Sequence, residues 1–112
     1  MTDDKKEILI ERMRDNLKIL RLKLDVSQEQ LASLVGTSRF TIMALENKTR
    51  KMTWSTFLSL LLIFTKNPET DKMLSLFEIY TDELNDALKM RNTQEGDKNW
   101  NEKNWFWLWY NK

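Results

Sequence analysis

The chain has 112 residues, enough for one hydrophobic core, and its 18 Lys or Arg against 17 Asp or Glu give a net charge of +1, which does not by itself indicate a nucleic-acid binder. It contains no Cys and no His, which excludes disulfides, thiolate metal sites and histidine-dependent catalysis. Only two Gly and one Pro are present, a composition that favours helices throughout. We therefore expect an all-α protein that is not an enzyme and has no metal or cofactor.

Charge is distributed unevenly along the chain. Residues 1–52 hold eleven Lys or Arg against eight Asp or Glu, whereas residues 53–92 hold four against six. The first residues, Met1 to Glu7, are charged and unlike a signal peptide, and the longest apolar run, residues 57–64, is too short to span a bilayer. We expect a cytoplasmic protein whose first half is the better candidate for contacting an anionic partner.

The first helix is expected over about residues 5–24. Apolar side chains recur there at steps of three and four residues, as one face of a helix requires. They are Ile10, Met13, Leu17, Leu20 and Leu24. We expect this face to form one wall of the core.

Residues 26–47, VSQEQLASLVGTSRFTIMALEN, have the layout of two short helices joined by a tight turn. Ser27 and Gln30 match the S-x-x-Q pattern of a capping box, Gly36 stands where a helix end needs positive φ, and Ser38 can cap a second helix. The inward-facing residues we expect are Leu31, Ala32, Leu34 and Val35 in the first helix and Ile42 and Leu45 in the second. Such a layout places the start of the second helix where it can enter a DNA major groove.

The same stretch resembles the DNA-binding domain of the phage repressor and Cro (XRE-like) family. The motifs that carry the resemblance are S-Q-E-Q-L-A, V-G-T-S and T-I-x-x-L-E-N, preceded by the L-x-x-L-R of residues 17–21. The likeness extends over roughly residues 10–65, about half of the chain. It implies a five-helix repressor-type helix-turn-helix domain over residues 1–66, followed by a C-terminal helix and a Trp-rich tail over residues 67–112.

Two positions depart from the family pattern. Lys48 stands where the family usually has Gly after Glu-Asn, and Thr53 stands where it often has Pro. We therefore expect the loop between these two residues to follow an unusual path.

The resemblance also implies how such a domain would touch DNA. The residues expected against base edges are Ser38, Arg39, Phe40, Thr41 and Ala44. Those expected against phosphates are Gln28, Arg21, Lys48, Arg50 and Lys51. Arg39 can pair with guanine through two parallel hydrogen bonds or else contact a phosphate, and Phe40 can pack on a thymine methyl or in the local core. In the family, an arginine of the first helix also pairs with a glutamate that ends the third, and the matching residues here are Arg21 and Glu46.

A further helix is expected over residues 54–65, after Thr53 as its N-cap, and its apolar residues go almost all the way round. Such a helix is buried on more than one side, so a C-terminal helix or a second subunit should cover it. Asn67-Pro68 then breaks the chain, and Thr70 is expected to cap a helix over about residues 71–90. The Thr81-Asp82 pair allows a kink or a second start within it.

The end of the chain is dominated by aromatic side chains. A polar stretch, residues 92–99, is expected as a loop, and residues 100–110 then read WNEKNWFWLWY. The interface candidates are Trp100, Trp105, Phe106, Trp107, Leu108, Trp109 and Tyr110. This tail can pack on its own domain, across a dimer or against another protein, or lie at a membrane surface. The membrane arrangement is the least expected, because the flanks lack a basic excess.

These features predict a sequence-specific double-stranded-DNA-binding transcriptional regulator, a homodimeric repressor that reads the major groove with the helix over residues 39–46. The alternative is a protein-interaction module, antitoxin-like or anti-repressor, that binds another protein through the aromatic tail. Neither function needs an enzymatic site.

Deletion of residues 100–112 is expected to lower the midpoint of thermal unfolding. Burial of two Trp at roughly 200 Å² each contributes on the order of 10 kcal/mol before ordering costs, at about 25 cal/mol per Å². The emission of the tail Trp residues should therefore be blue-shifted and protected from iodide. Water-like emission that turns blue only when lipid vesicles are added would contradict packing of the tail on the protein's helices and would favour the membrane arrangement.

Overall fold

The computed structural model describes residues 1–89, and within that range every regular element is an α-helix. The helices are α1 (Asp3–Leu24), α2 (Gln28–Val35), α3 (Arg39–Glu46), α4 (Trp54–Thr65), α5 (Pro68–Leu76) and α6 (Asp82–Leu88). The expected all-α class is confirmed for this part of the chain.

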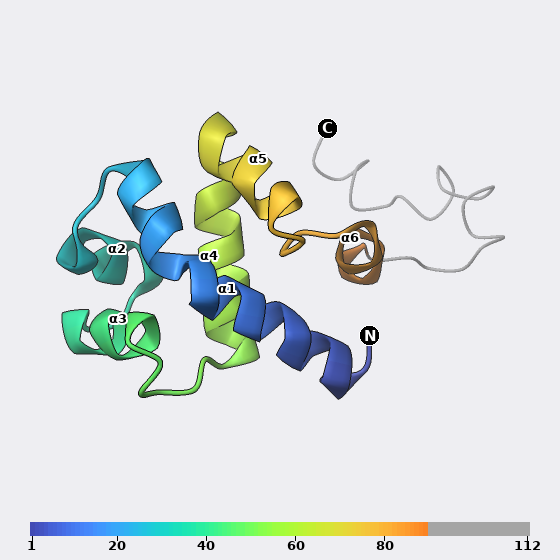
Figure 1. The fold of residues 1–112 in the computed structure, drawn as a ribbon, viewed down its shortest axis with the longest axis horizontal. Coiled ribbons are helices and arrows are strands. Elements are labelled where there is room, and N and C mark those ends of the chain that lie inside the picture. The colour runs from blue at the N-terminus through green and yellow to red at the C-terminus, as the bar shows by residue number, and fades with distance from the viewer. Residues whose placement is uncertain (90–112) are drawn as a thin grey trace, which may run out of the picture.

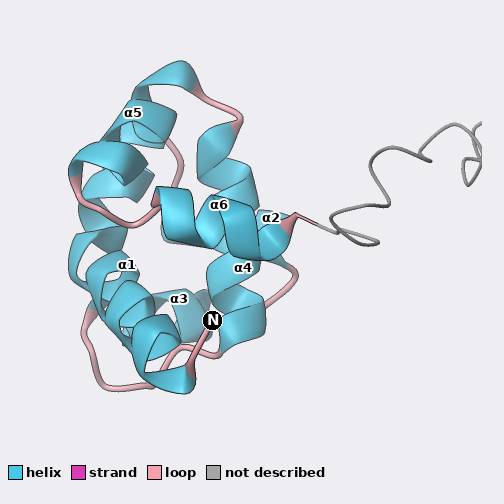
Figure 2. Cartoon of the chain, turned by 90° about the vertical axis from the view of Figure 1, so that its right-hand side faces the viewer, coloured by secondary structure: helices cyan, strands magenta, loops and turns pink. Residues whose placement is uncertain are grey.

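The helices share one core, with the long α1 crossing α4 (Figure 1). At one end of the molecule α2 and α3 pack on each other, with α3 also against α1 and α2 against α4. Helix α5 packs on both α1 and α4, and α6 lies near the start of α1 (Figure 2). Leu74, Ile79 and Leu84 join the same buried cluster as Leu17 and Phe57. The core therefore continues past residue 66.

Helix α1 begins at Asp3, slightly before the expected start, because Thr2 caps it. The Thr2 hydroxyl accepts a hydrogen bond from the Lys5 amide at 3.3 Å. The predicted apolar face is buried except at its end. Met13, Leu17 and Leu20 are fully buried and Ile10 is nearly so, whereas Leu24 is only half-buried.

The two predicted helix starts at Ser27 and Ser38 are confirmed. Ser27 Oγ accepts from the Gln30 amide at 3.0 Å, and Gln30 Oε1 accepts from the Ser27 amide at 2.8 Å, so the capping box is complete. Gly36 ends α2 at φ +87°, and Ser38 Oγ accepts from the Thr41 amide at 3.2 Å.

The inward face predicted for α2 is wrong at one residue. Leu34 is 59% exposed, whereas Leu31 and Ala32 are buried and Val35 is half-buried. At 3.6 residues per turn, Leu34 lies about 200° around the helix from Ala32, so both cannot face one core.

Helix α4 has the expected bounds, and the Thr53 hydroxyl caps it by accepting from the Thr56 amide at 3.1 Å. Phe57, Leu60, Leu61 and Phe64 are buried. Cover on more than one side comes from α1, α2 and α5, as expected for a helix this apolar, although Leu62 remains exposed. No helix among residues 1–89 combines the length and the apolar character needed to cross a membrane.

The helix predicted after Thr70 starts earlier and is divided into two. Asn67 Oδ1 accepts from the Glu69 amide at 2.9 Å and the Thr70 amide at 3.2 Å, with Pro68 at the first helical position. Thr70 is fully buried inside α5, where its hydroxyl donates to the Phe64 carbonyl at 2.6 Å, so its predicted capping role is wrong.

The second part, α6, begins after Thr81, the position where the sequence allowed a new start. Thr81 Oγ1 accepts from the Leu84 amide at 3.1 Å. Between the two helices Glu78 takes φ +56°, a left-handed conformation that ends α5. The predicted loop over residues 92–99 and the aromatic tail from Trp100 lie outside the described residues.

Thr70→Val should destabilise the protein by about 1 kcal/mol, because the Phe64 carbonyl loses a buried hydrogen bond while side-chain shape is kept. Chemical denaturation of the variant and the parent measures the difference. Thr49→Val, at an exposed position, is the control and should change stability much less. An unchanged unfolding midpoint for Thr70→Val would show that this bond contributes nothing.

Candidate nucleic-acid interface

A buried ion pair joins the first and third helices. Arg21 Nε of α1 donates to Glu46 Oε2 at 2.6 Å, and Arg21 Nη2 donates to Glu46 Oε1 at 3.3 Å. The side chains are only 10% and 4% exposed. This two-pronged contact fixes the end of α3 against α1, and it joins the two residues that the sequence led us to expect as a pair.

The same pair also holds the beginning of α2. Gln28 Nε2 donates to Glu46 Oε1 at 3.1 Å, and Arg21 Nη1 donates to the Val26 carbonyl at 3.0 Å. Three helices therefore meet at one polar cluster: Arg21, Gln28 and Glu46. The Arg21 guanidinium is turned into the molecule, so these contacts support a role for Arg21 in positioning Gln28 and Glu46. The contact between Arg21 and a DNA phosphate stays a prediction.

The exposed side of α3 carries the residues predicted to face bases. Ser38, Arg39 and Phe40 are exposed, and Thr41 and Ala44 are half-buried. Phe40 is 76% exposed, so its alternative place in the local core is not occupied. The opposite side of the helix buries Ile42 and Leu45, as predicted. An arginine and an aromatic ring therefore stand in solvent at the first turn of a helix whose other side is fixed in the core.

Hydroxyl groups link the start of α3 to the following loop. Ser38 Oγ lies 3.0 Å from Thr41 Oγ1, and Arg50 Nη1 donates to the same Thr41 oxygen at 3.3 Å. The guanidinium of Arg50, predicted to contact phosphate, thus lies beside the residues predicted to contact bases.

The loop after α3 takes the backbone conformation of a glycine without having one. Lys48 has φ +61°, its amide donates to the Leu45 carbonyl at 3.2 Å, and the Thr49 amide donates to the Ala44 carbonyl at 3.0 Å. A lysine in the left-handed conformation is strained. The loop is held by the ion pair between Lys48 and Asp15 and by the buried side chain of Met52. Lys48 therefore ends α3 with a left-handed turn, at the point where the sequence led us to expect an unusual path.

Basic residues outnumber acidic ones around this loop. Arg39, Lys48, Arg50 and Lys51 are exposed, whereas the carboxylates of Asp15 and Glu46 are engaged by Lys48 and Arg21.

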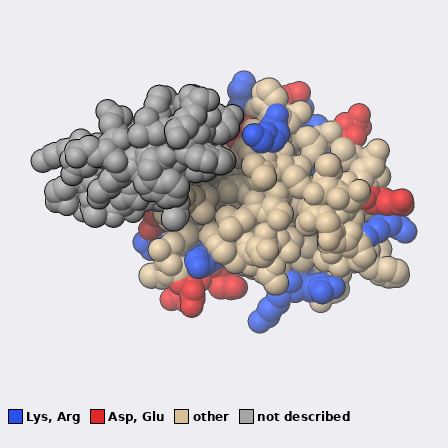
Figure 3. Space-filling view, turned by 180° about the vertical axis from the view of Figure 1, so that it is seen from behind, with Lys and Arg blue, Asp and Glu red and all other residues tan. Residues whose placement is uncertain are grey.

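On the side seen in Figure 3, charged groups surround a broad uncharged area. Exposed Glu69, whose pKa is lowered by a hydrogen bond and attraction from Lys23, belongs to α5 and not to the face around α3.

Sequence reasoning missed one residue that supports the face from behind the loop, Arg14 of α1. It donates from Nη1 to the Arg50 carbonyl at 2.9 Å and pairs with Glu11. Arg14 precedes Arg21 by seven residues, two helical turns, and this spacing is the signal that could have placed it on the same side of α1.

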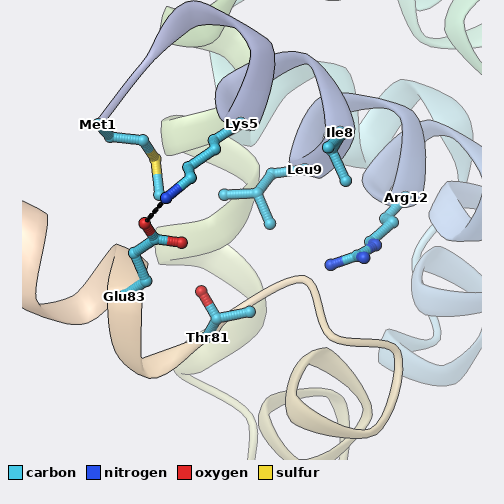
Figure 4. Close-up of a pocket in the computed structure, with 7 residues that line it drawn as sticks. All are labelled: Met1, Lys5, Ile8, Leu9, Arg12, Thr81 and Glu83. Atoms are coloured by element: carbon cyan, nitrogen blue, oxygen red, sulfur yellow. Dashed lines mark hydrogen bonds and ion pairs between the residues drawn. The ribbon is translucent and has the colours of Figure 1, made fainter.

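A separate open hollow of about 250 Å³ lies between the start of α1 and α6 (Figure 4). Lys5 pairs with Glu83 across it, and Arg12 Nη1 donates to the Glu78 carbonyl at 2.8 Å. The first contact joins α6 to α1, and the second joins the loop between α5 and α6 to α1. Neither here nor elsewhere in residues 1–89 do three or more acidic residues gather in a way that could hold a metal ion.

Comparison of the chain with family models, with curated proteins and with solved structures gave no match. The functional interpretation therefore depends on the geometry of the face formed by α3, the start of α2 and the loop at residues 48–51.

Glu46→Ala should destabilise the protein by about 3–5 kcal/mol, because it leaves a buried guanidinium without its carboxylate. Asp15→Ala removes the carboxylate of an exposed pair, with Lys48, and should cost no more than about 1 kcal/mol. Urea denaturation of both variants gives the comparison. Equal losses would contradict the importance assigned to the buried pair.

Proposed function

We propose that this protein binds double-stranded DNA in a sequence-specific manner, as a transcriptional repressor of the phage repressor and Cro (XRE-like) type. In this proposal α2 and α3 are the two helices of the helix-turn-helix, in a domain whose core continues past the expected boundary at residue 66 into α5 and α6. The observation that carries it is the exposed first turn of α3, with Arg39 and Phe40 in solvent, on a helix anchored by the Arg21–Glu46 pair. Base reading requires such a helix, because side chains specify sequence only from a fixed position.

The dimensions of α3 suit a major groove. With its side chains an α-helix is about 10–12 Å in diameter, and the major groove is about 12 Å wide. Arg39 would pair with the O6 and N7 atoms of a guanine, and Phe40 would pack on a thymine methyl beside it. Thr41 and Ala44, half-buried on the same helix, are small enough to let the backbone approach the bases.

The surrounding groups would hold the DNA backbone. Lys48, Arg50 and Lys51 provide positive charge on one loop, and the first amides of α2 provide the partial positive charge of a helix N-terminus. The Gln28 side chain donates to Glu46 through Nε2, so its contact with a phosphate would have to share or replace this hydrogen bond. These contacts would be independent of sequence and would position α3.

We further propose that the protein acts as a cytoplasmic homodimer. Two copies of a helix of this kind read two half-sites about one helical turn apart, which is why such regulators pair. The runner-up function, a protein-interaction module, is favoured by an open hollow of about 440 Å³ with a partly apolar lining. Exposed Leu34 and half-buried Leu24, Val26 and Ile63 contribute to it.

Titration of labelled random-sequence duplex at several salt concentrations tests DNA binding directly. Lys51→Ala should weaken binding to all sequences and reduce the slope of log affinity against log salt by about one, because one fewer cation is displaced. Gln28→Ala should weaken binding with the slope unchanged, since glutamine carries no charge. If neither change alters affinity, the assigned docking face is wrong.

Arg39→Ala should weaken binding to the selected sequence by roughly 1–3 kcal/mol and relax preference at one base pair per half-site. The target is first obtained by selection from a random duplex pool. Affinities of both proteins for the selected and for random duplex are then compared. An equal loss on the two duplexes would show that Arg39 contacts only phosphate.

A further inference from the structure

We propose that Arg14 is a positioning residue for the DNA-binding face, which fixes Arg50 against the start of α3 without itself touching DNA. This inference rests on the proposed function. It concerns a residue of α1 that lies outside the helix-turn-helix segment, and it identifies a clamp between α1 and the loop after α3.

The first contact of the clamp is made to the backbone. Arg14 Nη1 donates to the Arg50 carbonyl at 2.9 Å, and the other end of the Arg14 guanidinium pairs with Glu11 one turn earlier. The Arg14 side chain is only 16% exposed. Because α1 is a 22-residue helix whose inner face is in the core, this donor has a fixed origin. The Arg50 backbone is therefore tied to a rigid element.

The second contact is made by the side chain of Arg50. Its Nη1 donates to Thr41 Oγ1 at 3.3 Å, and Thr41 in turn shares a hydrogen bond with Ser38 at 3.0 Å. A free arginine side chain samples many rotamers, and ordering it costs free energy. With the carbonyl held by Arg14 and the guanidinium resting on Thr41, Arg50 is already ordered on the face that would meet DNA, and binding is tighter when this ordering precedes it.

Burial of Arg14 carries a local cost. Its Nε is buried and has no hydrogen-bond partner among the described residues. An unsatisfied buried donor destabilises a fold, so a methionine of similar length would pack at this half-buried position at least as well. The guanidinium is better explained by what it holds, namely the Arg50 carbonyl.

A double-mutant cycle tests the clamp. Arg14→Met, Arg50→Ala and the double variant are compared with the parent for affinity to the selected duplex. We expect Arg14→Met to weaken binding about fivefold, the size of one hydrogen bond. In the Arg50→Ala background it should have no further effect, because no guanidinium remains to be placed. Losses that simply multiply would overturn the proposal, since Arg14 would then act independently of Arg50.

Lys18→Met is the matched control, because it removes one positive charge from an exposed position of the same helix. We expect it to change affinity by less than Arg14→Met does. Equal losses would mean that only net charge matters and would overturn the clamp. Should Arg14→Met fail to fold, Arg14→Lys keeps the charge, lacks the forked donor, and carries the same cycle.

A measurement without DNA separates this proposal from the proposed function. In the free protein, ¹⁵N relaxation should show larger fast motions at Arg50 and its neighbours in Arg14→Met than in the parent. Unchanged motion there would overturn the clamp even if DNA binds. If the parent binds no duplex, the proposed function fails, and increased loop motion in Arg14→Met still supports the contact between Arg14 and Arg50.

Discussion

The buried contact between Arg21 and Glu46 is the constraint on which the arrangement of the first three helices depends. Helices α2 and α3 have only eight residues each, too few to be stable alone, so tertiary contacts must hold them. Leu31, Ile42 and Leu45 provide apolar burial, which is non-directional. The ion pair, extended by Gln28, adds direction, because a forked donor meets a carboxylate in few geometries.

Charged side chains have two different roles in this molecule. Arg14 and Arg21 are largely buried and act on neighbouring protein groups, whereas Arg39 and Lys51 stand in solvent. A net charge of +1 conceals this division, because acidic residues elsewhere balance the total. What matters for an anionic partner is the local field, which the exposed cations of α3 and its loop provide.

Local rules predicted the parts of the fold that local chemistry determines. The caps at Ser27, Ser38 and Thr53 need only neighbouring residues, and each is present. Thr70 failed as a cap because Asn67 starts the helix three residues earlier, by accepting from the Glu69 and Thr70 amides, and the core takes up the Thr70 hydroxyl, a tertiary effect. The contact between Arg14 and Arg50 joins residues 36 apart, and no spacing rule indicates its partner.

NMR titration of the ¹⁵N-labelled full chain with duplex DNA tests the central claim most directly. It reports the binding surface residue by residue, without a substitution. The account predicts shift changes concentrated at residues 27–29, 38–44 and 48–51, with the amides of α5 little affected. Changes centred on α4 or α5, or an unchanged spectrum at saturating duplex, would contradict a DNA-binding face built on α3.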